Sequence, residues 1–460
     1  NLDSWERFIT DTRRTYHREG IFTPAVEDII SHTMMSGDEK ILSLLKTYFE
    51  PDDYFLVYKR MIGTGCIGGK ACGMLLARKI IQKENPEAFA HMEPHDSYYL
   101  GSDVFYTYIV HNKFWRLHIH QKTKQGYFKL APELEQAFLS GSFPESIRLQ
   151  FIRMLEYFGQ RPIIVRSSSL QEDAFGNAFA GKYESVFCIN SGTMDERLTE
   201  LENAVRTVYA STMNPSALEY RRQRGLGFKD EQMALLIQRV SGSMYENFLM
   251  PNAAGVGYSY SAYKWDDSID ASAGMLRLVM GLGTRAVDRT EGDYPRIVNL
   301  SAPERSTLTE SWAKHQYSQR YVDLMDYTTK SLSSRPLKDV TPYMDSWYKK
   351  LVLEHDSDAE RTFRERGQRR EILFASCEGL VRNTEFTGCM KSLLHTLQHA
   401  YQYPVDIEFT INGTDTGEFV FNLLQCRPLQ VGTRRDAVTV PSLPEDKTVF
   451  SVTGSSMGGS

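Results

Sequence analysis

The sequence predicts an α+β fold of two lobes with a cleft, preceded by a helical N-terminal extension. Short apolar runs alternate with helical patterns along the main body, as in the strand candidate "RPIIVRSSS" and the later segment "TMDERLTELENAVRTVYAST". In that later segment Met194, Leu198 and Leu201 share one face at helical spacing. Thr193 and Glu196 offer the same helix a capping box.

The chain divides into four expected segments. Residues 1–54 are polar and helical, as in "DEKILSLLKTYF", and form the N-terminal extension. Residues 55–240 are expected to form the first lobe and residues 241–432 the second, with a largely helical, charged insert over 305–400. Residues 433–460 end in "TGSSMGGS" and are expected to be a linker toward a further domain, because the sequence is typical of a piece of a longer protein.

Composition excludes several functional classes. The 460 residues are 41% hydrophobic and 24% charged, enough to bury large cores. A formal net charge of −5 argues against a nucleic-acid-binding protein. The six cysteines form no CxxC pair and no Cys/His cluster, which indicates a reducing cytoplasm without a disulfide framework or structural zinc. No apolar run approaches membrane-spanning length.

A glycine-rich turn, "GTGCIGGKACGM", precedes a helical pattern at residues 63–81. A P-loop requires Gly and Ser or Thr where this chain has Thr64 and Ala71, so that interpretation fails. The alternatives are a tight turn that needs glycine for its geometry and a site that holds phosphate. Lys70 favours phosphate, because it places a mobile cation at the start of a helix, where backbone N–H groups attract anions.

The same turn also contains a literal Gly63-x-Gly65-x-x-Gly68, which raises the possibility of a dinucleotide site. That fingerprint requires a βαβ unit with an acidic residue about 20 residues further on. Glu87 falls near that distance, but the sequence around it, "QKENPEAFAHMEPHDSYY", predicts no strand that would present it. The sequence therefore gives weak support to a dinucleotide-dependent oxidoreductase.

A second polar cluster lies in "VRSSSLQEDAFGNAFAGKYESV". Arg166 ends an apolar strand and opens this loop, and a planar guanidinium at a strand end suits phosphoryl oxygens. Gly181 and Ser185 then supply close backbone approach and a hydroxyl. The alternative is a surface loop in which Arg166 pairs with Glu172 or Asp173.

A third cluster lies in "PVDIEFTINGTDTGEFVFNLLQCRPLQ", which predicts a β-hairpin. Alternation places Asp406 and Glu408 on one face of the first strand, and Gln425 and Arg427 on one face of the second. Carboxylate and amide oxygens suit Mg²⁺, and Arg427 can neutralise a transferring phosphoryl group. The alternative is an ordinary hairpin with one solvated face, since the sequence does not fix the strand register.

These motifs, together with "LLIQRV" and "GLGT", occur in the order found in a known family. From about residue 60 to 430 the chain resembles the N-terminal ATP-binding domain of phosphoenolpyruvate synthase and pyruvate phosphate dikinase. The resemblance implies an ATP-grasp-like pair of lobes that closes on ATP and Mg²⁺. The matching site positions are Lys70, Arg166, Gly181, Ser185, Gln238, Asp406, Glu408, Gln425 and Arg427.

The resemblance also implies a role for each position. Lys70, Arg166 and Arg427 would be catalytic cations at the phosphates, with the glycine at 181 and the hydroxyl at 185 beside them. Gln238 would lie beside the adenine and ribose. Glu408 and Gln425 would bind the metal, and the carboxylate at 406 would be their acidic neighbour.

The implied reaction is that of a phosphotransferase with paired acceptors. A histidine on a separate swivelling domain attacks the β-phosphorus of ATP, and AMP is released. The phosphohistidine then carries the group to a barrel domain, where pyruvate becomes phosphoenolpyruvate, while the γ-phosphate ends on water or on phosphate. None of the eleven histidines lies in a Gly/Thr-rich acceptor segment, so both partner domains are expected outside this chain.

The chain departs from the family pattern at "GLGTRAVD", where Thr284 replaces a common glutamate and is left out of the expected site. Arg285 is expected in a plain ion-pair loop with its neighbours Asp288 and Arg289. The segment "FWRLHIHQK", with His118 and His120, is interpreted as a strand or amphipathic edge. His395 and His399 lie one helical turn apart, but they lack nearby ligands for a metal.

Other functions stay open at this point. The same ATP-binding module serves dikinases with glucan or antibiotic acceptors. A non-catalytic ATP-sensing module is a second class, which a phosphoacceptor segment beyond residue 460 would exclude.

Overall fold

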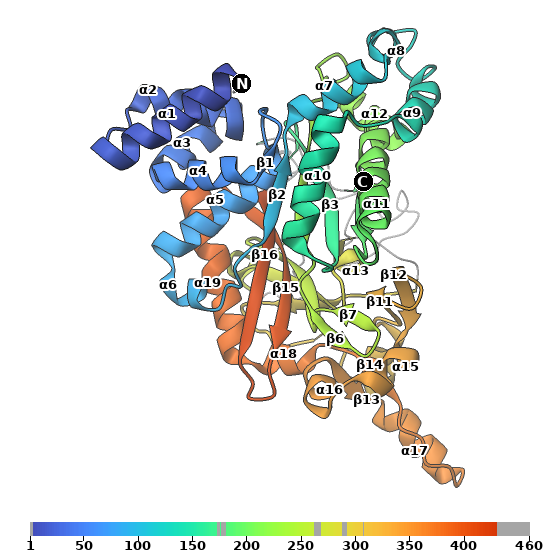
Figure 1. The fold of residues 1–460 in the computed structure, drawn as a ribbon. Helices are drawn as coiled ribbons and strands as arrows, with labels where there is room; N and C mark the ends of the chain where they lie inside the picture. The colour runs from blue at the N-terminus through green and yellow to red at the C-terminus, as the bar shows by residue number, and fades with distance from the viewer. Residues whose placement is uncertain are drawn as a thin grey trace, which may run out of the picture.

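A computed structural model of the chain describes residues 3–172, 175, 181–261, 268–287, 292–306 and 308–429. Figure 1 shows an α+β molecule with two lobes built on separate sheets and a group of helices at the N-terminus beside them. The expected linker over 433–460 lies outside the described residues. None of the described helices is both long enough and apolar enough to cross a membrane.

The N-terminal extension is helical, as predicted. Its elements are α1 (Ser4–Glu19), α2 (Pro24–Ile30), the π-helical turn η1 (Ser31–Met35), α3 (Glu39–Tyr48) and α4 (Pro51–Lys59). Leu45 and Tyr54 are buried in the same apolar core as Leu76 of helix α5 (Gly69–Glu84). The ion pair between Asp53 and Lys79, at 2.7 Å, also joins the extension to α5. Helix α5 therefore lies between the extension and the lobes.

The first lobe contains a five-stranded sheet with the order β1-β2-β5-β3-β4. Its strands are β1 (Met61–Ile62), β2 (Ser97–Leu100), β3 (Ile163–Ser169), β4 (Ser185–Cys188) and β5 (Met233–Arg239). The helices of this lobe are α6 (Pro86–Ala90), α7 (Ser102–His111), α8 (Trp115–Gln121), α9 (Ala131–Ser140), α10 (Glu145–Phe158), α11 (Met194–Ser211) and α12 (Pro215–Gln223). Most of them pack with the sheet into a second apolar core.

The second lobe contains an antiparallel sheet with the order β10-β9-β8-β15-β16. Its strands are β8 (Ala253–Tyr258), β9 (Met275–Met280), β10 (Arg296–Asn299), β15 (Val405–Gly413) and β16 (Phe419–Pro428), with helices η2 (Ala271–Ala273), α13 (Thr284–Val287) and α19 (Thr384–Tyr401). Strand β16 packs against α5, so the hairpin β15–β16 lies next to the first lobe (Figure 1).

The insert over 305–400 was predicted to be largely helical, and this is only partly right. It supplies β11 (Tyr321–Asp326) and β12 (Ser331–Pro336), which join β6 (Ser243–Tyr245) and β7 (Phe248–Met250), from before β8, in a second sheet with the order β12-β11-β7-β6. It also contains the separate strand pair β13 (Leu353–His355) and β14 (Leu373–Ala375). The helices are α14 (Ser311–Gln316), α15 (Leu337–Val340), η3 (Thr341–Tyr343), α16 (Ser346–Val352), α17 (Ser357–Glu365) and α18 (Glu378–Arg382). Strand β12, "SLSSRP", lacks the apolar alternation that would have revealed it.

Two other local predictions were wrong. The segment with His118 and His120 forms helix α8, because Leu117, His118 and Gln121 face inward at helical spacing while Ile119 is exposed. A parallel β1-α5-β2 unit does surround the glycine-rich turn, although no strand was expected after it. Glu87 nevertheless lies exposed in α6, away from any strand, as the sequence indicated.

The predicted strand at "RPIIVRSSS" is confirmed as β3, but it continues through Arg166 to Ser169 and does not end at the arginine. The predicted capping box is also confirmed at the start of α11. The Glu196 N–H donates to Thr193 Oγ1 at 3.3 Å, and the Thr193 N–H donates to Glu196 Oε2 at 2.7 Å.

We predict that Thr193→Ala lowers the free energy of unfolding by about 1 kcal/mol, because it leaves a helix N–H group without its acceptor. Thr193→Ser keeps the hydroxyl and is the matched control. Urea unfolding followed by circular dichroism measures both variants. Equal destabilisation by alanine and serine would show that the cap is not the cause.

Candidate functional site

A cavity of about 390 Å³ lies between the two lobes. This volume is in the range of small-molecule sites. Strands β3, β4 and β5 of the first lobe line one side, and β15, β16 and α13 of the second lobe line the other. The predicted site residues that line it are Lys70, Arg166, Gly181, Ser185, Gln238, Glu408, Gln425 and Arg427. The remaining predicted residue, Asp406, bonds to Arg427 through its carboxylate.

The first half of the glycine-rich turn holds a carboxylate of the protein itself. Asp103, at the start of α7, accepts hydrogen bonds from the N–H groups of Thr64 at 3.0 Å and Gly65 at 2.8 Å. Gly63 has a φ of +87°, and a Cβ there would lie 2.6 Å from the same carboxylate. These backbone donors therefore serve the fold, and from this turn the side chain of Lys70 reaches the cavity.

The second half of the turn presses α5 against the end of β3. A Cβ on Gly68 would lie 1.5 Å from the Ser168 carbonyl oxygen, and one on Gly69 would lie 1.8 Å from the Glu172 carbonyl oxygen. Ser168 Oγ accepts from the Ala71 N–H at 3.0 Å, which satisfies one of the free donors of the helix start. This close packing places the neighbouring lysine side chain in the cavity.

Lys70 pairs with a buried carboxylate rather than with solvent. Its Nζ donates to Ser167 Oγ at 3.3 Å and lies 3.6 Å from Glu172 Oε1. Glu172 is held in turn by the Ser167 hydroxyl at 2.9 Å and by the Ser169 N–H at 2.8 Å. The sequence did not place this glutamate in the site, although it lies three residues after the serine run. It was considered only in the alternative in which Arg166 pairs with Glu172 or Asp173, whereas the structure pairs Arg166 with Glu408.

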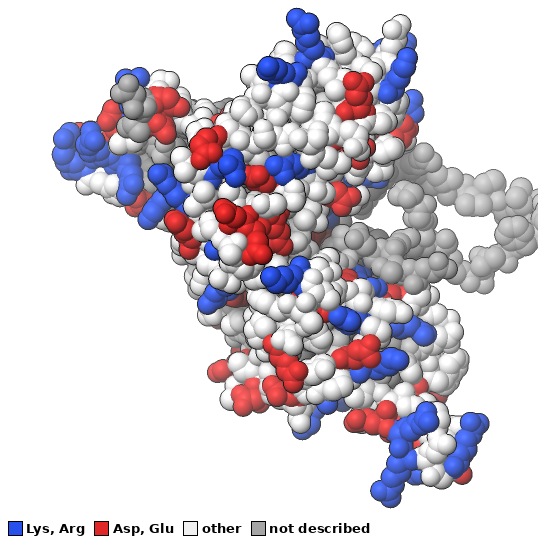
Figure 2. Space-filling model, turned by 45° about the vertical axis from the view of Figure 1, so that its right-hand side comes forward, with Lys and Arg blue, Asp and Glu red and all other residues white. Residues whose placement is uncertain are grey.

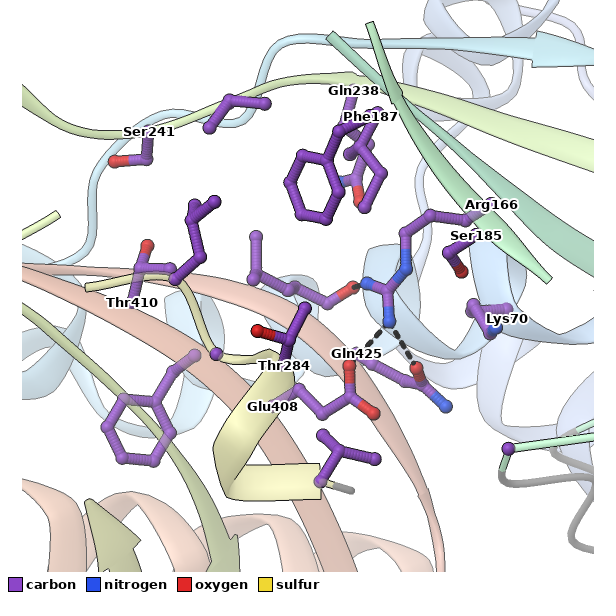
Figure 3. A pocket seen from close by; sticks show the side chains of 18 of the residues that line it. Lys70, Arg166, Ser185, Phe187, Gln238, Ser241, Thr284, Glu408, Thr410 and Gln425 are labelled. Atoms are coloured by element: carbon purple, nitrogen blue, oxygen red, sulfur yellow. Dashed lines mark hydrogen bonds and ion pairs between the residues drawn. The ribbon is translucent and has the colours of Figure 1, made fainter. Parts of the chain in front are cut away.

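Arg166 instead bridges the two lobes. Figure 3 shows its guanidinium pointing from β3 toward two side chains of the β15–β16 hairpin. Arg166 Nη2 donates to Glu408 Oε2 at 2.5 Å and to Gln425 Oε1 at 2.9 Å, while Nη1 donates to the Leu424 carbonyl at 3.4 Å. The other partner considered from the sequence, Asp173, lies outside the described residues.

The register of the hairpin explains why its polar groups meet. Glu408 lies opposite Gln425 and Asp406 lies opposite Arg427, with an irregularity just after Glu408. Asp406, Gln425 and Arg427 are 7%, 1% and 8% exposed, respectively. The alternative of an ordinary hairpin with a solvated face is therefore wrong, because the first lobe covers that face.

Burial and neighbouring charges shift the pKa values of the two hairpin carboxylates, Glu408 and Asp406. Burial raises the pKa of Glu408, but the charges of Arg166, Arg427 and Lys70 outweigh burial and hold the pKa below its usual value. For Asp406 burial wins, so its pKa lies above the usual value even though Arg427 Nε is 2.7 Å from Oδ1. The charge of Glu408 adds to that rise. The nearby cations thus favour the ionised form of Glu408.

Gln238 lies in β5 at the far side of the cavity. Its Nε2 donates to Ser97 Oγ at 3.3 Å, and among the described residues its buried Oε1 has no hydrogen-bond partner. Ser185 begins β4 directly opposite Arg166, and Gly181 precedes it with a φ of +64°. Gln238 and Ser185 thus bring an amide and a hydroxyl side chain to the wall of the cavity.

Thr284 lines the cavity although it was left out of the predicted site. Its hydroxyl donates to Asp323 Oδ2 at 2.6 Å. Asp323 lies in β11. Arg285, in α13, forms ion pairs with Asp293 and Asp323, which were not the partners considered from the sequence. Its neighbours at 288 and 289 lie outside the described residues.

The histidines contribute no metal site in the part of the chain that the structure describes. That part holds no group of three or more His, Cys, Asp or Glu side chains suited to a metal. His118 is 2% exposed, and burial together with Lys122 and Arg221 lowers its pKa to about 3. His395 and His399 lie along α19, as their spacing indicated.

Two lobes that enclose a cavity lined by lysine, arginines and carboxylates define an ATP-grasp-like nucleotide-binding domain. The family model described as the pyruvate phosphate dikinase AMP/ATP-binding domain matches residues 64–447. The chain belongs to this family and is an ATP/AMP-binding domain of the pyruvate phosphate dikinase type. No curated protein matches the chain at a significant level.

We predict that Glu408→Gln costs more stability at pH 7 than near pH 3.5. The folded pKa of Glu408 lies below the value of 4.5 that it has without the fold. Its ion pair with Arg166 therefore stabilises fully above that value and is lost as the pH falls through the folded pKa. Urea unfolding of both proteins across this pH range measures the difference.

The control for this prediction is Glu418→Gln, an exposed change on the same hairpin. It should change stability by less than about 0.5 kcal/mol at any pH. A Glu408→Gln penalty that stays constant with pH would contradict the assignment.

Proposed function

We propose that the chain binds Mg-ATP between its lobes and presents the β-phosphate to a histidine of a separate swivelling domain. The phosphohistidine then transfers the group to pyruvate on a barrel domain, as in a phosphoenolpyruvate synthase-like dikinase, and AMP is released. The observation that carries the proposal is the convergence of Lys70, Arg166 and Arg427, from separate segments, on one cavity. Membership of an AMP/ATP-binding family supports a nucleotide as the occupant.

The three cations suit phosphoryl transfer because this chemistry needs little covalent help from the protein. It needs in-line positioning and positive charge spread over the phosphate oxygens. Lys70 contacts Glu172, Arg166 contacts Glu408, and Arg427 contacts Asp406. Each cation is thus held by a carboxylate close to where a phosphate would bind, and the phosphates would take over the ionic contacts of Lys70 and Arg166.

Glu408 and Gln425 fit a magnesium ion, because both side-chain oxygens converge on one point, the Nη2 atom of Arg166. An ionised carboxylate beside an amide oxygen is a hard-oxygen donor set of the kind Mg²⁺ accepts, with water and phosphate oxygens completing the shell. When bound, the metal would neutralise charge on the phosphates. Asp406, which holds Arg427, is proposed to orient that guanidinium toward the cavity.

Gln238, Gly181 and Ser185 are proposed to bind the rest of the nucleotide. The unused Oε1 of Gln238 can accept a hydrogen bond from the amino group of adenine, as the buried acceptor requires. The glycine allows close backbone approach to the phosphates, and the serine hydroxyl can donate to them.

We also propose the division of the chain into residues 1–54, 55–240, 241–432 and 433–460. The two sheets support the division between lobes, since β5 ends before residue 240 and β6 begins after it. Helix α4 crosses residue 54, so the extension continues into the first lobe without a break. A cytoplasmic location is proposed from the six free cysteines.

We predict that Lys70→Ala and Arg427→Ala slow phosphoryl transfer by about a hundredfold or more while weakening ATP binding much less. The reason is that positive charge at the phosphates is needed most in the transition state. Calorimetry gives the ATP affinity. AMP formation after addition of a separately produced phosphoacceptor histidine domain of this family gives the transfer rate.

Lys79→Ala is the matched control, because Lys79 lies on the same helix and pairs with Asp53 outside the cavity. It should leave both quantities unchanged. Equal losses of affinity and rate in the cavity variants would contradict a role in the transition state. ATP binding without acceptor-dependent AMP formation by the wild-type chain would indicate an ATP-sensing module.

A further inference from the structure

We propose that Arg166 and a divalent cation compete for the same two oxygens, so that metal binding depends on nucleotide binding. This inference rests on the proposed function of the cavity and concerns how the site is loaded. In the structure, a single nitrogen of Arg166 makes both contacts, to Glu408 Oε2 at 2.5 Å and to Gln425 Oε1 at 2.9 Å (Figure 3). A cation bound by both of these oxygens would compete with this nitrogen for them.

The two oxygens cannot easily move apart to accept the guanidinium and a metal together. Glu408 and Gln425 are direct partners in the register of β15 and β16, and β15 is held on its other side by β8. Gln425 is 1% exposed. Magnesium requires oxygens at about 2.0–2.1 Å, so the positively charged nitrogen must leave before the metal arrives.

Burial makes this exchange depend on a new partner for the arginine. The side chains of Arg166 and Glu408 are only 9% and 15% exposed, so a displaced guanidinium has little access to water. A buried charge that loses its partner is strongly unfavourable. Phosphate oxygens can supply that partner, because the cavity beside Arg166 also contains Lys70 and Ser185.

The result is a coupling between two ligands through one side chain. Nucleotide phosphates that draw Arg166 away leave Glu408 and Gln425 to the metal. By linkage, the metal raises nucleotide affinity by the same factor. Arg166 thus acts in the free site as a substitute cation that keeps both oxygens paired.

Arg427 provides the control that separates this competition from general electrostatic repulsion. Its charge also lowers the pKa of Glu408, so its removal makes the site more negative too. Its guanidinium, however, is bonded to Asp406, and these two residues form the register pair two positions along the hairpin from Glu408 and Gln425. Both Arg166→Met and Arg427→Met remove one positive charge near Glu408, but the first also uncovers the oxygens.

The experiment measures Mn²⁺ binding to the full chain by electron paramagnetic resonance, for the wild type and both variants without added nucleotide. Arg166→Met is expected to bind Mn²⁺ about tenfold tighter than the wild type or more, and Arg427→Met less than about threefold tighter. A double variant, Arg166→Met with Glu408→Gln, should lose the gain. An unchanged affinity in Arg166→Met, or equal gains in both single variants, would overturn the proposal.

Two further measurements keep the test decisive. Circular dichroism and thermal melting check that the variants fold. If Arg166→Met does not fold, Arg166→Gln, which keeps a hydrogen-bond donor, takes its place. Calorimetric titration of the wild type with ATP and excess Mg²⁺ tests the proposed function separately. Absence of ATP binding there would overturn that function, whereas ATP binding with no Mn²⁺ gain in the arginine variant overturns only the competition.

Discussion

The contact of Arg166 with Glu408 and Gln425 is the interaction on which the site depends. It joins β3 of the first sheet to the β15–β16 hairpin of the second, so both lobes share one buried ion pair. It also keeps Glu408 ionised despite burial, since the nearby positive charges outweigh desolvation. A site that must bind a highly charged ligand is thereby kept electrically balanced inside the protein.

Glycines and serines build the frame around this contact. Gly68 allows the start of α5 to touch the end of β3, and Ser168 fastens the two with hydrogen bonds. Ser167 and Glu172 then hold Lys70 at the cavity. On the face drawn in Figure 2, charges of both signs are distributed over the surface.

The sequence predicted much of this arrangement because its signals are local. Alternation in the "VDIEF" segment showed which side chains share a face, and the apolar run before Arg166 indicated a strand, although that strand continues to Ser169. The partners could not be predicted, since the register of the hairpin and the approach of the lobes depend on packing between distant segments. Asp103 accepts a hydrogen bond from the N–H group of Gly65, which lies 38 residues away in the sequence. Asp323 accepts one from the hydroxyl of Thr284, which lies 39 residues away. Strand β12 was missed because "SLSSRP" has no apolar periodicity.

The most direct test of the account is a crystal structure of the chain with a non-hydrolysable ATP analogue and Mg²⁺. The account predicts the triphosphate in the cavity, Arg166 on its oxygens, and the metal on Glu408 and Gln425. A nucleotide bound elsewhere, or one bound in the cavity while Arg166 still holds both oxygens, would contradict it.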